Sequence, residues 1–258
     1  MEKMHLEDKL EYIACRVDKN TKIKDNIYEI EFKGNFNGKP GQFYMLRSWN
    51  MYPLLSRPIS ICYLDENKIT FLYQVVGNGT KKLSLLHQGD EVKLTGPLGN
   101  GFDIDKMNGK ISIVSGGIGI APMLYLVKNI KETLNKGNIQ IDLYAGFKKD
   151  TYILDRFEQF VDNIYYSVEV GKGEETVGYI TDIFHPENYD MVLCCGPEPM
   201  MKKVVNMCGD KKVPLYVSME NHMACGVGAC LVCTCKTKHG NKRTCCDGPV
   251  FSGEDLVL

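Results

Sequence analysis

The chain has 258 residues, 44% of them apolar, which is enough for two compact domains with cores of their own. Its 31 Lys and Arg residues against 32 Asp and Glu residues leave a net charge of -1, which excludes a bulk attraction to nucleic acid or to an anionic membrane. The N-terminal residues lack the apolar segment of a signal peptide, and the longest uncharged run, residues 111–127, falls short of the roughly 20 residues that a bilayer span needs. We therefore expect a cytoplasmic protein without a membrane partner.

The first hundred residues predict an antiparallel β-barrel. Six segments combine alternating polarity with β-branched or aromatic residues, and turns separate them. These segments are residues 10–17, 26–34, 42–49, 57–64, 68–76 and 90–96. A short helix over residues 80–86, directly after the glycines of "GNG", interrupts the series. We place this first domain at residues 1–100.

Residues 101–212 predict a parallel α/β domain, because strand-like and helical segments alternate there. The strand-like segments are residues 110–117, 139–147, 164–170 and 189–196, and the helical ones are residues 118–137, 153–161 and 197–210. Pro122 near the start of the first helix and Gly137 beyond its last turn are typical of helix ends. The remaining residues, 213–258, are rich in cysteine and too few to hold a core without a metal.

Six of the eleven cysteines lie in the last 34 residues. In a reducing compartment an odd and clustered set indicates metal ligands instead of disulfides. Cys225, Cys230 and Cys233 have the C-x4-C-x2-C spacing of plant-type 2Fe-2S proteins. Gly226 and Gly228 allow the loop to fold around a cluster with its amide N–H groups turned towards sulfur.

A fourth thiolate is expected from a hairpin that turns near Gly240 and returns beside Cys233. Hairpin geometry does not choose between Cys245 and Cys246, because a one-residue change in loop length exchanges them. A zinc site with four cysteine ligands is the alternative. Zinc sites favour paired C-x2-C knuckles, however, and this segment contains one such pair, so the spacing favours the iron–sulfur cluster.

Two short motifs in the predicted barrel suit the pyrophosphate of a flavin dinucleotide. Arg57 opens the strand "RPIS", and "GNGT", residues 77–80, opens the short helix, so that a guanidinium and free helix amides are available to phosphate. Taken singly, each motif has an ordinary interpretation: Arg57 as a solvated strand residue, and Gly77 and Gly79 as a turn.

Two further motifs follow strands of the predicted α/β sheet. "SGGIGIAP", residues 115–122, lies between a strand and a helix, where a dinucleotide phosphate meets free amides, although it is not the G-x-G-x-x-G fingerprint. "CCGPEPM", residues 194–200, places Cys195 and Gly196 at the carboxyl edge, where open α/β sheets bind ligands. A buried thiol at the end of a strand is the alternative for Cys195.

The order of these motifs resembles the ferredoxin-NADP reductase superfamily across essentially the whole chain. "MACGVGAC", the C-x-"DGPVF" ending and "GGIGIAP" are similar to the electron-transfer subunit of type B dihydroorotate dehydrogenase, the NAD-linked bacterial enzyme of pyrimidine synthesis. The resemblance implies an antiparallel six-stranded flavin-binding barrel, a parallel α/β nicotinamide-binding domain at residues 101–212, and a small C-terminal 2Fe-2S module at residues 213–258.

The resemblance also implies residues for three cofactors. Those implied for FAD are Arg57, Pro58, Ile59, Ser60, Leu72, Tyr73, Gln74, Gly79 and Thr80. Those implied for NAD(H) are Gly116, Gly117, Gly119, Cys195, Gly196 and Pro197. Those implied for the cluster are Cys225, Cys230, Cys233 and Cys245, because the family's fourth ligand is separated by one residue from D-G-P-V-F. Cys246 then occupies the variable position.

Two of these residues have implied catalytic roles: Ser60 as a hydrogen-bond partner near N5 of the flavin, and Cys195 beside C4 of the nicotinamide. A nicotinamide gives up electrons as a pair and a cluster accepts them singly, so a flavin must convert between them. The implied route is NADH, FAD and then 2Fe-2S. Lys148 and Lys149 are a candidate site for the extra phosphate of NADPH, but exposed loop lysines are usually only solvated.

The three segments leave no domain for an organic substrate, so electrons must be exchanged with another protein. By resemblance, this partner is the FMN-containing catalytic subunit, which oxidises dihydroorotate to orotate and sends electrons towards NAD+, in a heterotetramer of two copies of each chain. A related subunit of an NADH-dependent ferredoxin:NADP oxidoreductase or sulfide dehydrogenase is the second interpretation. A zinc-stabilised binding protein without redox cofactors is the third.

Overall fold

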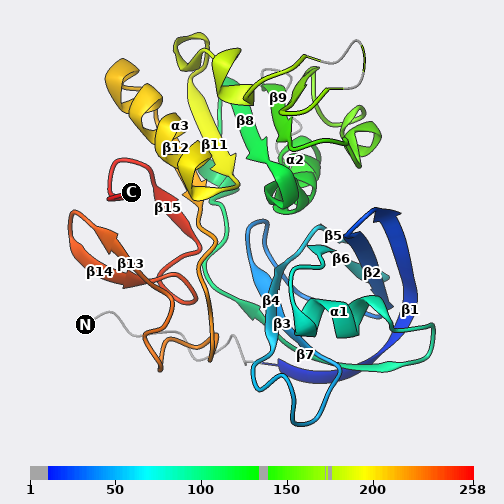
Figure 1. Ribbon diagram of the computed structural model, residues 1–258. Coiled ribbons are helices and arrows are strands. Elements are labelled where there is room, and N and C mark those ends of the chain that lie inside the picture. Colours follow the sequence, from blue (N-terminus) through cyan, green and yellow to red (C-terminus); the bar gives the residue numbers. More distant parts are fainter. Residues whose placement is uncertain (1–10, 134–138, 172, 174–175) are drawn as a thin grey trace.

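The computed structural model describes residues 11–133, 139–171, 173 and 176–258. Figure 1 shows an antiparallel barrel in blue and cyan, an α/β lobe in green and yellow above it, and a C-terminal segment in orange and red beside both. The fold class predicted from the sequence is confirmed. The predicted helix end at Gly137 lies outside the described residues.

The barrel sheet contains seven strands in the order β4-β3-β7-β1-β2-β6-β5, and all its pairs are antiparallel. The strands are β1 (Glu11–Lys24), β2 (Ile27–Lys33), β3 (Phe43–Arg47), β4 (Arg57–Ser60), β5 (Tyr63–Leu64), β6 (Lys68–Gln74) and β7 (Glu91–Leu98). The count exceeds the predicted six because residues 57–64 form two short strands instead of one.

The two residues between β4 and β5 close the barrel. The backbone N–H of Ile61 donates to the carbonyl of Gln42, just before β3, at 3.0 Å. The N–H of Cys62 donates to the carbonyl of Thr70 on β6, also at 3.0 Å. The chain therefore passes from one edge of the sheet to the other within residues 61 and 62, and both edges are satisfied.

Alternate residues of the barrel strands point inwards, and aromatic rings fill the interior. Tyr44 and Phe71 meet edge to face with their ring centroids 5.7 Å apart. Helix α1 (Asn78–Ser84) begins two residues before the predicted helix and connects β6 to β7. The side-chain amide of Asn20 donates to the carbonyls of Leu83 and Leu86, both at 2.9 Å, and so satisfies the C-terminal end of α1.

The second sheet has the order β10-β9-β8-β11-β12-β15. Its parallel strands are β8 (Lys110–Gly116), β9 (Gln140–Phe147), β10 (Asn163–Val168), β11 (Met191–Cys195) and β12 (Leu215–Ser218). The last strand, β15 (Val250–Ser252), pairs antiparallel with β12 and comes from the Cys-rich end of the chain. The predicted division of the chain at residues 100 and 212 stays a prediction.

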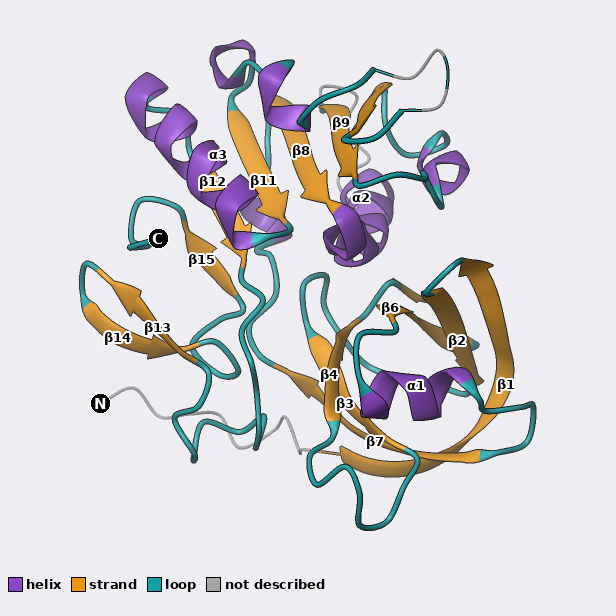
Figure 2. Cartoon of the chain, viewed as in Figure 1, coloured by secondary structure: helices purple, strands orange, loops and turns teal. Residues whose placement is uncertain are grey.

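Helices α2 (Ala121–Thr133) and α3 (Glu198–Lys211) cover opposite faces of this sheet (Figure 2). Successive residues of a strand point to opposite faces, and the two apolar clusters follow that rule. Ile113 and Leu193 belong to the cluster that contains α2, whereas Val114 and Val192 belong to the cluster that contains α3.

The helix predicted over residues 153–161 is wrong. Only a 3-10 turn, Leu154–Phe157, forms there. Phe157 is nevertheless buried in the core, and Leu154 packs against the same cluster. The backbone of Ile153 is left-handed, with φ 53°, which an α-helix of L-residues does not continue through.

The barrel and the α/β lobe share apolar and polar contacts. Leu72 of the barrel lies in the same apolar cluster as Ile120 and Leu124. The guanidinium of Arg156 pairs with both carboxylate oxygens of Glu29, with Nη2 donating to Oε1 at 3.2 Å and Nη1 donating to Oε2. These contacts hold the barrel against the α2 face of the second sheet.

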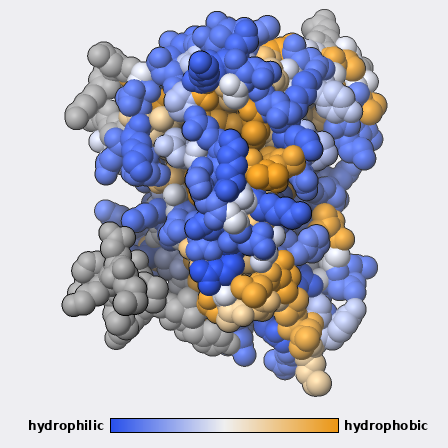
Figure 3. Space-filling view, turned by 90° about the vertical axis from the view of Figure 1, so that its left-hand side faces the viewer, coloured by the Kyte–Doolittle hydropathy of each residue, from blue (hydrophilic) through white to orange (hydrophobic). Residues whose placement is uncertain are grey.

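The C-terminal segment contains the predicted hairpin, formed by β13 (Thr234–Thr237) and β14 (Gly240–Arg243). Figure 3 views the side of the molecule on which this segment lies. Apolar side chains gather in the lower part of that view. In the part of the chain that the structure describes, no helix has the length and apolarity to span a bilayer.

Candidate cofactor sites

The two barrel motifs predicted separately from the sequence lie against each other. A Cβ on Gly79, in the first turn of α1, would stand 2.7 Å from Cζ of Arg57 on β4, so a side chain there would displace the guanidinium. Arg57 also lies over the ring of Trp49, 5.6 Å from its centroid, and its Nη1 donates to the carbonyl of Leu55 at 2.9 Å. Burial lowers the pKa of Arg57, but a guanidinium remains charged in proteins.

Thr80 uses its hydroxyl to shape the loop before α1. Its Oγ1 accepts the backbone N–H groups of Val76 at 3.0 Å and Gly77 at 3.2 Å, and donates to the carbonyl of Gly77 at 3.1 Å. The side chain is buried within these contacts. Thr80 therefore fixes the shape of the loop that precedes α1.

The three predicted residues on β6 have different surroundings. Leu72 packs in the cluster shared with the α/β lobe, whereas Tyr73 points into the barrel, where its hydroxyl donates to Oδ1 of Asn20 at 3.2 Å. Burial raises the pKa of Tyr73, so the phenol stays neutral. Gln74 is half-buried at the end of the strand. The ring of Tyr73 is therefore taken up by the barrel interior.

Strand β4 carries the remaining predicted flavin residues, and all four of its side chains are half-buried. It pairs with β3 in the register that places Ile59 opposite Tyr44 and Ser60 opposite Phe43. Pro58 stands opposite Met45. Ser60 therefore lies at the end of β4, beside Phe43 of β3, and Phe43 also packs against the cysteine centre.

The two glycine motifs of the second sheet meet at its carboxyl edge. β8 and β11 are adjacent, with Ser115 opposite Cys195. A Cβ on Gly119 would stand 2.5 Å from the carbonyl oxygen of Cys195, and a Cβ on Gly196 would stand 2.8 Å from the backbone nitrogen of Gly116. Close packing of the two loops thus requires these glycines, whatever ligand lies above them.

Gly117 and Pro197 complete the predicted nicotinamide set. Gly117 is left-handed, with φ 53°, and the position of its Cβ faces open space. Pro197 precedes α3 and lies against Gly116, where a Cβ would stand 2.8 Å from its Cδ. The structure therefore brings the six predicted residues to one edge, where the loops after β8 and β11 meet.

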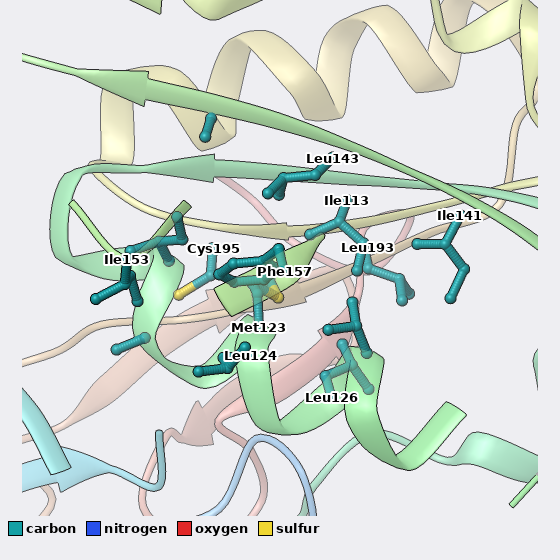
Figure 4. Packing of buried hydrophobic residues seen from close by; sticks show 14 of the residues in the cluster. Ile113, Met123, Leu124, Leu126, Ile141, Leu143, Ile153, Phe157, Leu193 and Cys195 are labelled. Carbon is teal, nitrogen blue, oxygen red and sulfur yellow. The ribbon is translucent and has the colours of Figure 1, made fainter. Parts of the chain in front are cut away.

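Cys195 lies in the apolar core under α2, as Figure 4 shows, with its side chain near those of Phe157 and Met123. Burial raises its pKa well above the ordinary value, so the thiol is neutral and not a thiolate nucleophile. Its Sγ lies 3.8 Å from Oε1 of Glu220. Cys195 is thus a buried thiol at the end of a strand, and it also lies at the edge where the two predicted nicotinamide motifs meet.

The sequence analysis did not identify Glu220. This residue is exposed, but the protein packed around its carboxyl group raises its pKa. It follows the end of β12, next to β11, and so stands at the same carboxyl edge as Cys195. A search for polar residues just beyond each predicted parallel strand is the signal that finds it.

The four predicted cluster ligands lie on one side of the barrel. Cys233 and Cys245 are 2% and 1% exposed and pack with Phe43, Met45 and Leu98 on the outer face of β3 and β7. Cys230 is exposed and Cys225 is half-buried. The centre therefore has a buried side towards the barrel and an open side towards solvent.

Backbone amides point at three of the sulfurs. Sγ of Cys225 accepts the N–H of Val227 at 3.4 Å, Sγ of Cys245 accepts that of Gly228 at 3.1 Å, and Sγ of Cys233 accepts that of Cys245 at 3.4 Å. Burial raises the pKa of Cys225, but nearby backbone N–H groups outweigh it and lower the pKa to about 6. Such N–H groups stabilise thiolates, which are the form that binds iron.

The predicted glycines explain this geometry. Gly226 and Gly228 have φ 74° and 78°, a left-handed conformation that costs glycine least. Gly226 also lies on the barrel, where a Cβ would stand 3.0 Å from Cδ1 of Leu98. The loop therefore needs both glycines to turn its amides inwards while resting on β7.

The cysteine side chains interact with one another, Cys225 with Cys230, and Cys245 with both Cys233 and Cys246. Among the residues that the structure describes, no three Cys, His, Asp or Glu side chains surround one point as ligands of a single ion. A 2Fe-2S centre takes two protein ligands on each iron, whereas a structural zinc ion takes four around one point. The thiols gathered on one side of the barrel, with backbone N–H groups directed at three of the sulfurs, fit a 2Fe-2S centre.

Cys246 lies next to this centre but faces it differently. A Cβ on Gly228 would stand 2.6 Å from its Sγ, and the side chain is half-buried. Cys245 is the more deeply buried of the two and accepts the amide of Gly228. The assignment of Cys245 as the fourth ligand stays a prediction.

Asn100, just beyond β7, ties this turn to the barrel. Its backbone N–H donates to the carbonyl of Gly248 at 2.6 Å, and its side-chain amide donates to the carbonyls of Cys246 at 3.0 Å and Asp247 at 3.3 Å. The sequence analysis missed this residue, since an isolated Asn after a strand carries no pattern of its own.

An antiparallel barrel, a parallel sheet with a ligand edge, and a four-cysteine centre packed on the barrel define an oxidoreductase of the ferredoxin reductase fold with an iron–sulfur module. Residues 220–257 match the iron–sulfur cluster binding domain of dihydroorotate dehydrogenase B, and residues 113–206 match the oxidoreductase NAD-binding domain. The chain belongs to the family of dihydroorotate dehydrogenase B electron transfer subunits.

Two relatives carry the name dihydroorotate dehydrogenase B (NAD(+)), electron transfer subunit. The one from Clostridium acetobutylicum is 55% identical over 251 residues, which cover 97% of this chain and 99% of that protein. The one from Clostridium perfringens is 49% identical over 247 residues, covering 96% and 98%. A solved structure of an NADH-dependent reduced ferredoxin-NADP oxidoreductase is similar with a TM-score of 0.82 at 26% identity, covering 94% of this chain and 89% of that one.

Proposed function

We propose that this chain is the electron transfer subunit of an NAD-linked dihydroorotate dehydrogenase. Its cofactors are FAD and a 2Fe-2S cluster, with NAD(H) as the exchangeable nucleotide. When bound, the flavin exchanges an electron pair with the nicotinamide and single electrons with the cluster, which links NAD to the FMN of the catalytic subunit. The reaction belongs to pyrimidine biosynthesis, and its proposed location is the cytoplasm, where thiols stay reduced.

One observation carries this proposal: the buried side of the cysteine centre rests on the strand beside the flavin motif. Cys233 and Cys245 pack on Phe43, and Phe43 pairs with Ser60. The centre is therefore separated from the "RPIS" strand by β3 alone. Electrons that arrive at this side of the barrel have a short route to the open side of the centre.

For the flavin, we propose that Arg57 and the start of α1 hold the pyrophosphate, because Gly79 gives the guanidinium its place. Ser60 is proposed to hydrogen-bond near N5, and Thr80 to fix the loop that precedes α1. Pro58, Ile59, Leu72, Tyr73 and Gln74 are proposed to contribute strand backbone and apolar contact. These roles follow from the half-buried face of β4 and the end of β6.

For the nicotinamide, we propose the edge at which the loops after β8 and β11 meet. Gly116, Gly117, Gly119, Gly196 and Pro197 shape it, and Cys195 lies beneath it. A neutral thiol at Cys195 offers a polarizable contact without adding charge beside a ring that gains or loses a hydride. We propose NAD instead of NADP, since Lys148 and Lys149 are simply exposed.

The open side of the centre is the proposed docking surface for the catalytic subunit. Cys230 is exposed there, and three apolar neighbours, Val227, Leu231 and Val232, are 47%, 62% and 55% exposed. Exposed apolar residues that gather in one patch mark protein interfaces. Two copies of each subunit are the proposed assembly.

Reconstitution with a catalytic subunit tests the proposal. The purified chain should show the visible absorption of flavin and 2Fe-2S together, and the complex should form NADH from NAD+ when dihydroorotate is added. A colourless protein that binds one zinc ion would refute it. A coloured protein that reacts with ferredoxin and NADP+ but with no dihydroorotate dehydrogenase subunit would favour the related ferredoxin-NADP oxidoreductase.

A further inference from the structure

Arg243 and Asp247 form a two-pronged ion pair within the turn that carries the proposed fourth ligand. Nε of Arg243 donates to Oδ2 of Asp247 at 3.0 Å, and Nη2 donates to Oδ1 at 3.1 Å. The backbone N–H of Arg243 also donates to Oδ2 at 2.7 Å. In return, the carbonyl of Arg243 accepts the N–H groups of Cys246 at 3.2 Å and Asp247 at 2.8 Å. The pair therefore fixes the shape of this turn.

The third nitrogen of the guanidinium reaches the cysteine loop. Nη1 of Arg243 donates to the carbonyl of Gly228 at 3.3 Å, and the N–H of the same glycine donates to Sγ of Cys245 at 3.1 Å. A Cβ on Gly228 would stand 3.1 Å from Nη1. The guanidinium of Arg243 and the sulfur of Cys245, a proposed ligand, thus contact the same residue, Gly228. The Asp247 carboxylate binds the opposite edge of the guanidinium, through Nε and Nη2.

We propose that Arg243 is a positioning residue that raises the reduction potential of the 2Fe-2S cluster, and that Asp247 opposes this effect by partly neutralising the guanidinium. The inference rests on the proposed ligand set. Reduction of the cluster adds one electron, and no bond forms or breaks. The added negative charge is stabilised by a nearby cation and destabilised by a nearby carboxylate. The two residues therefore act on the potential with opposite signs.

A purely structural role makes a different prediction. If the ion pair only holds the turn, removal of either partner loosens the same loop, and both substitutions change the cluster in the same direction. Arg243 and Asp247 side chains are 42% and 27% exposed, so solvent screens part of the electrostatic effect without abolishing it. The sign of the shift, and not its size, separates the two roles.

The experiment compares Asp247→Asn and Arg243→Gln in the full-length protein loaded with its cluster. The potential is measured by a dithionite titration followed by electron paramagnetic resonance, with iron content determined for each variant. We expect Asp247→Asn to raise the potential and Arg243→Gln to lower it. Arg243→Lys keeps the charge and should lie closer to the unchanged protein than Arg243→Gln does.

Lys236→Gln is the matched control, because it removes one positive charge from an exposed position on the same hairpin. It should leave the potential unchanged. Shifts of the same sign in Asp247→Asn and Arg243→Gln, no shift in either, or loss of iron from both would overturn the inference. If the unchanged protein itself held no cluster, the proposed function would fail first, so the two failures are distinguishable.

Discussion

The side-chain amide of Asn100 donates to the carbonyl of Cys246 at 3.0 Å, a contact between residues 146 positions apart in the chain. Asn100 belongs to the barrel end and Cys246 to the ligand turn, so this hydrogen bond helps to fix the distance between the flavin motif and the cysteine centre.

Asn100→Ala should slow reduction of the cluster by NADH while leaving flavin reduction unchanged. The substitution removes two side-chain hydrogen bonds, to Cys246 and Asp247, at a cost of about 1 kcal/mol each to the free energy of unfolding. Stopped-flow absorption at flavin and cluster wavelengths measures both steps. Asn108→Ala is the control, since its amide bonds only to the nearby carbonyl of Lys106. Equal rates in Asn100→Ala and Asn108→Ala would contradict the positioning role.

Gly79→Ala should weaken FAD binding by roughly tenfold or more, which corresponds to about 1.4 kcal/mol. The new methyl group would overlap the guanidinium of Arg57 and push it off the proposed phosphate site. The flavin-to-protein ratio and a fluorescence titration of the flavin-free protein measure the effect. Gly77→Ala is the matched control, because its backbone is extended and a Cβ there meets nothing within 4 Å. If both variants bound FAD equally well, the Arg57 assignment would lose its support.

Cys245→Ser should abolish the 2Fe-2S cluster, whereas Cys246→Ser should retain it. The structure buries Cys245 and gives its sulfur an amide donor, while Cys246 is half-buried beside it. Iron and sulfide content of the purified variants, together with the visible spectrum, decides between them. The reverse result would make Cys246 the fourth ligand.

Removal of the ion pair between the lobes should destabilise the protein more than removal of a surface pair. Glu29→Gln leaves the half-buried guanidinium of Arg156 without its charged partner, at a cost of about 2 kcal/mol. Lys203→Met, which breaks an exposed pair with Asp182, should cost less than about 1 kcal/mol. Urea unfolding of both variants measures the difference. Equal losses would mean that the Arg156 contact contributes nothing special to the lobe interface.

The stability of the protein should fall as pH rises above about 9, in part through Cys208. Burial raises the pKa of this thiol from 9.0 to about 12, so the folded state holds the proton more tightly than the unfolded state. Its contribution is fully present below pH 9 and is lost as pH rises towards 12. Cys208→Ala should reduce the slope of unfolding free energy against pH by up to about 1.4 kcal/mol per unit. The cavity left by the substitution costs the same at every pH, so an unchanged slope would refute the assignment.

Local patterns in the sequence predicted the parts of the molecule that local forces determine. Period-two alternation identified the barrel strands, and the spacing of Cys225, Cys230 and Cys233 identified a loop whose glycines turn amides towards sulfur. The strand-like segment of residues 57–64 did not reveal its division into β4 and β5. Ile61 and Cys62 are as apolar as their neighbours, and only the hydrogen bonds to Gln42 and Thr70 cause the crossing between edges.

The contacts that could not be predicted join distant parts of the chain. Glu220 reaches Cys195 because β12 lies beside β11, and that neighbourhood exists only in the assembled sheet. Asn100 reaches Cys246 because Asn100 and Pro249 form an isolated parallel bridge between distant parts of the chain. The segment around Phe157 was predicted as a helix, but it forms a short turn that buries the ring in the core.

The cysteine segment leaves the nicotinamide sheet after β12 and returns to it at β15, which pairs with β12. Both ends of the segment are therefore held by neighbouring strands. The segment should move together with that lobe, yet its buried thiols pack against the other lobe, on Phe43, Met45 and Leu98. A hinge motion that separated the lobes would first have to break this apolar contact between the cysteine segment and the barrel. The iron–sulfur segment therefore joins the two lobes, and the path for electrons stays intact only while both of its contacts are kept.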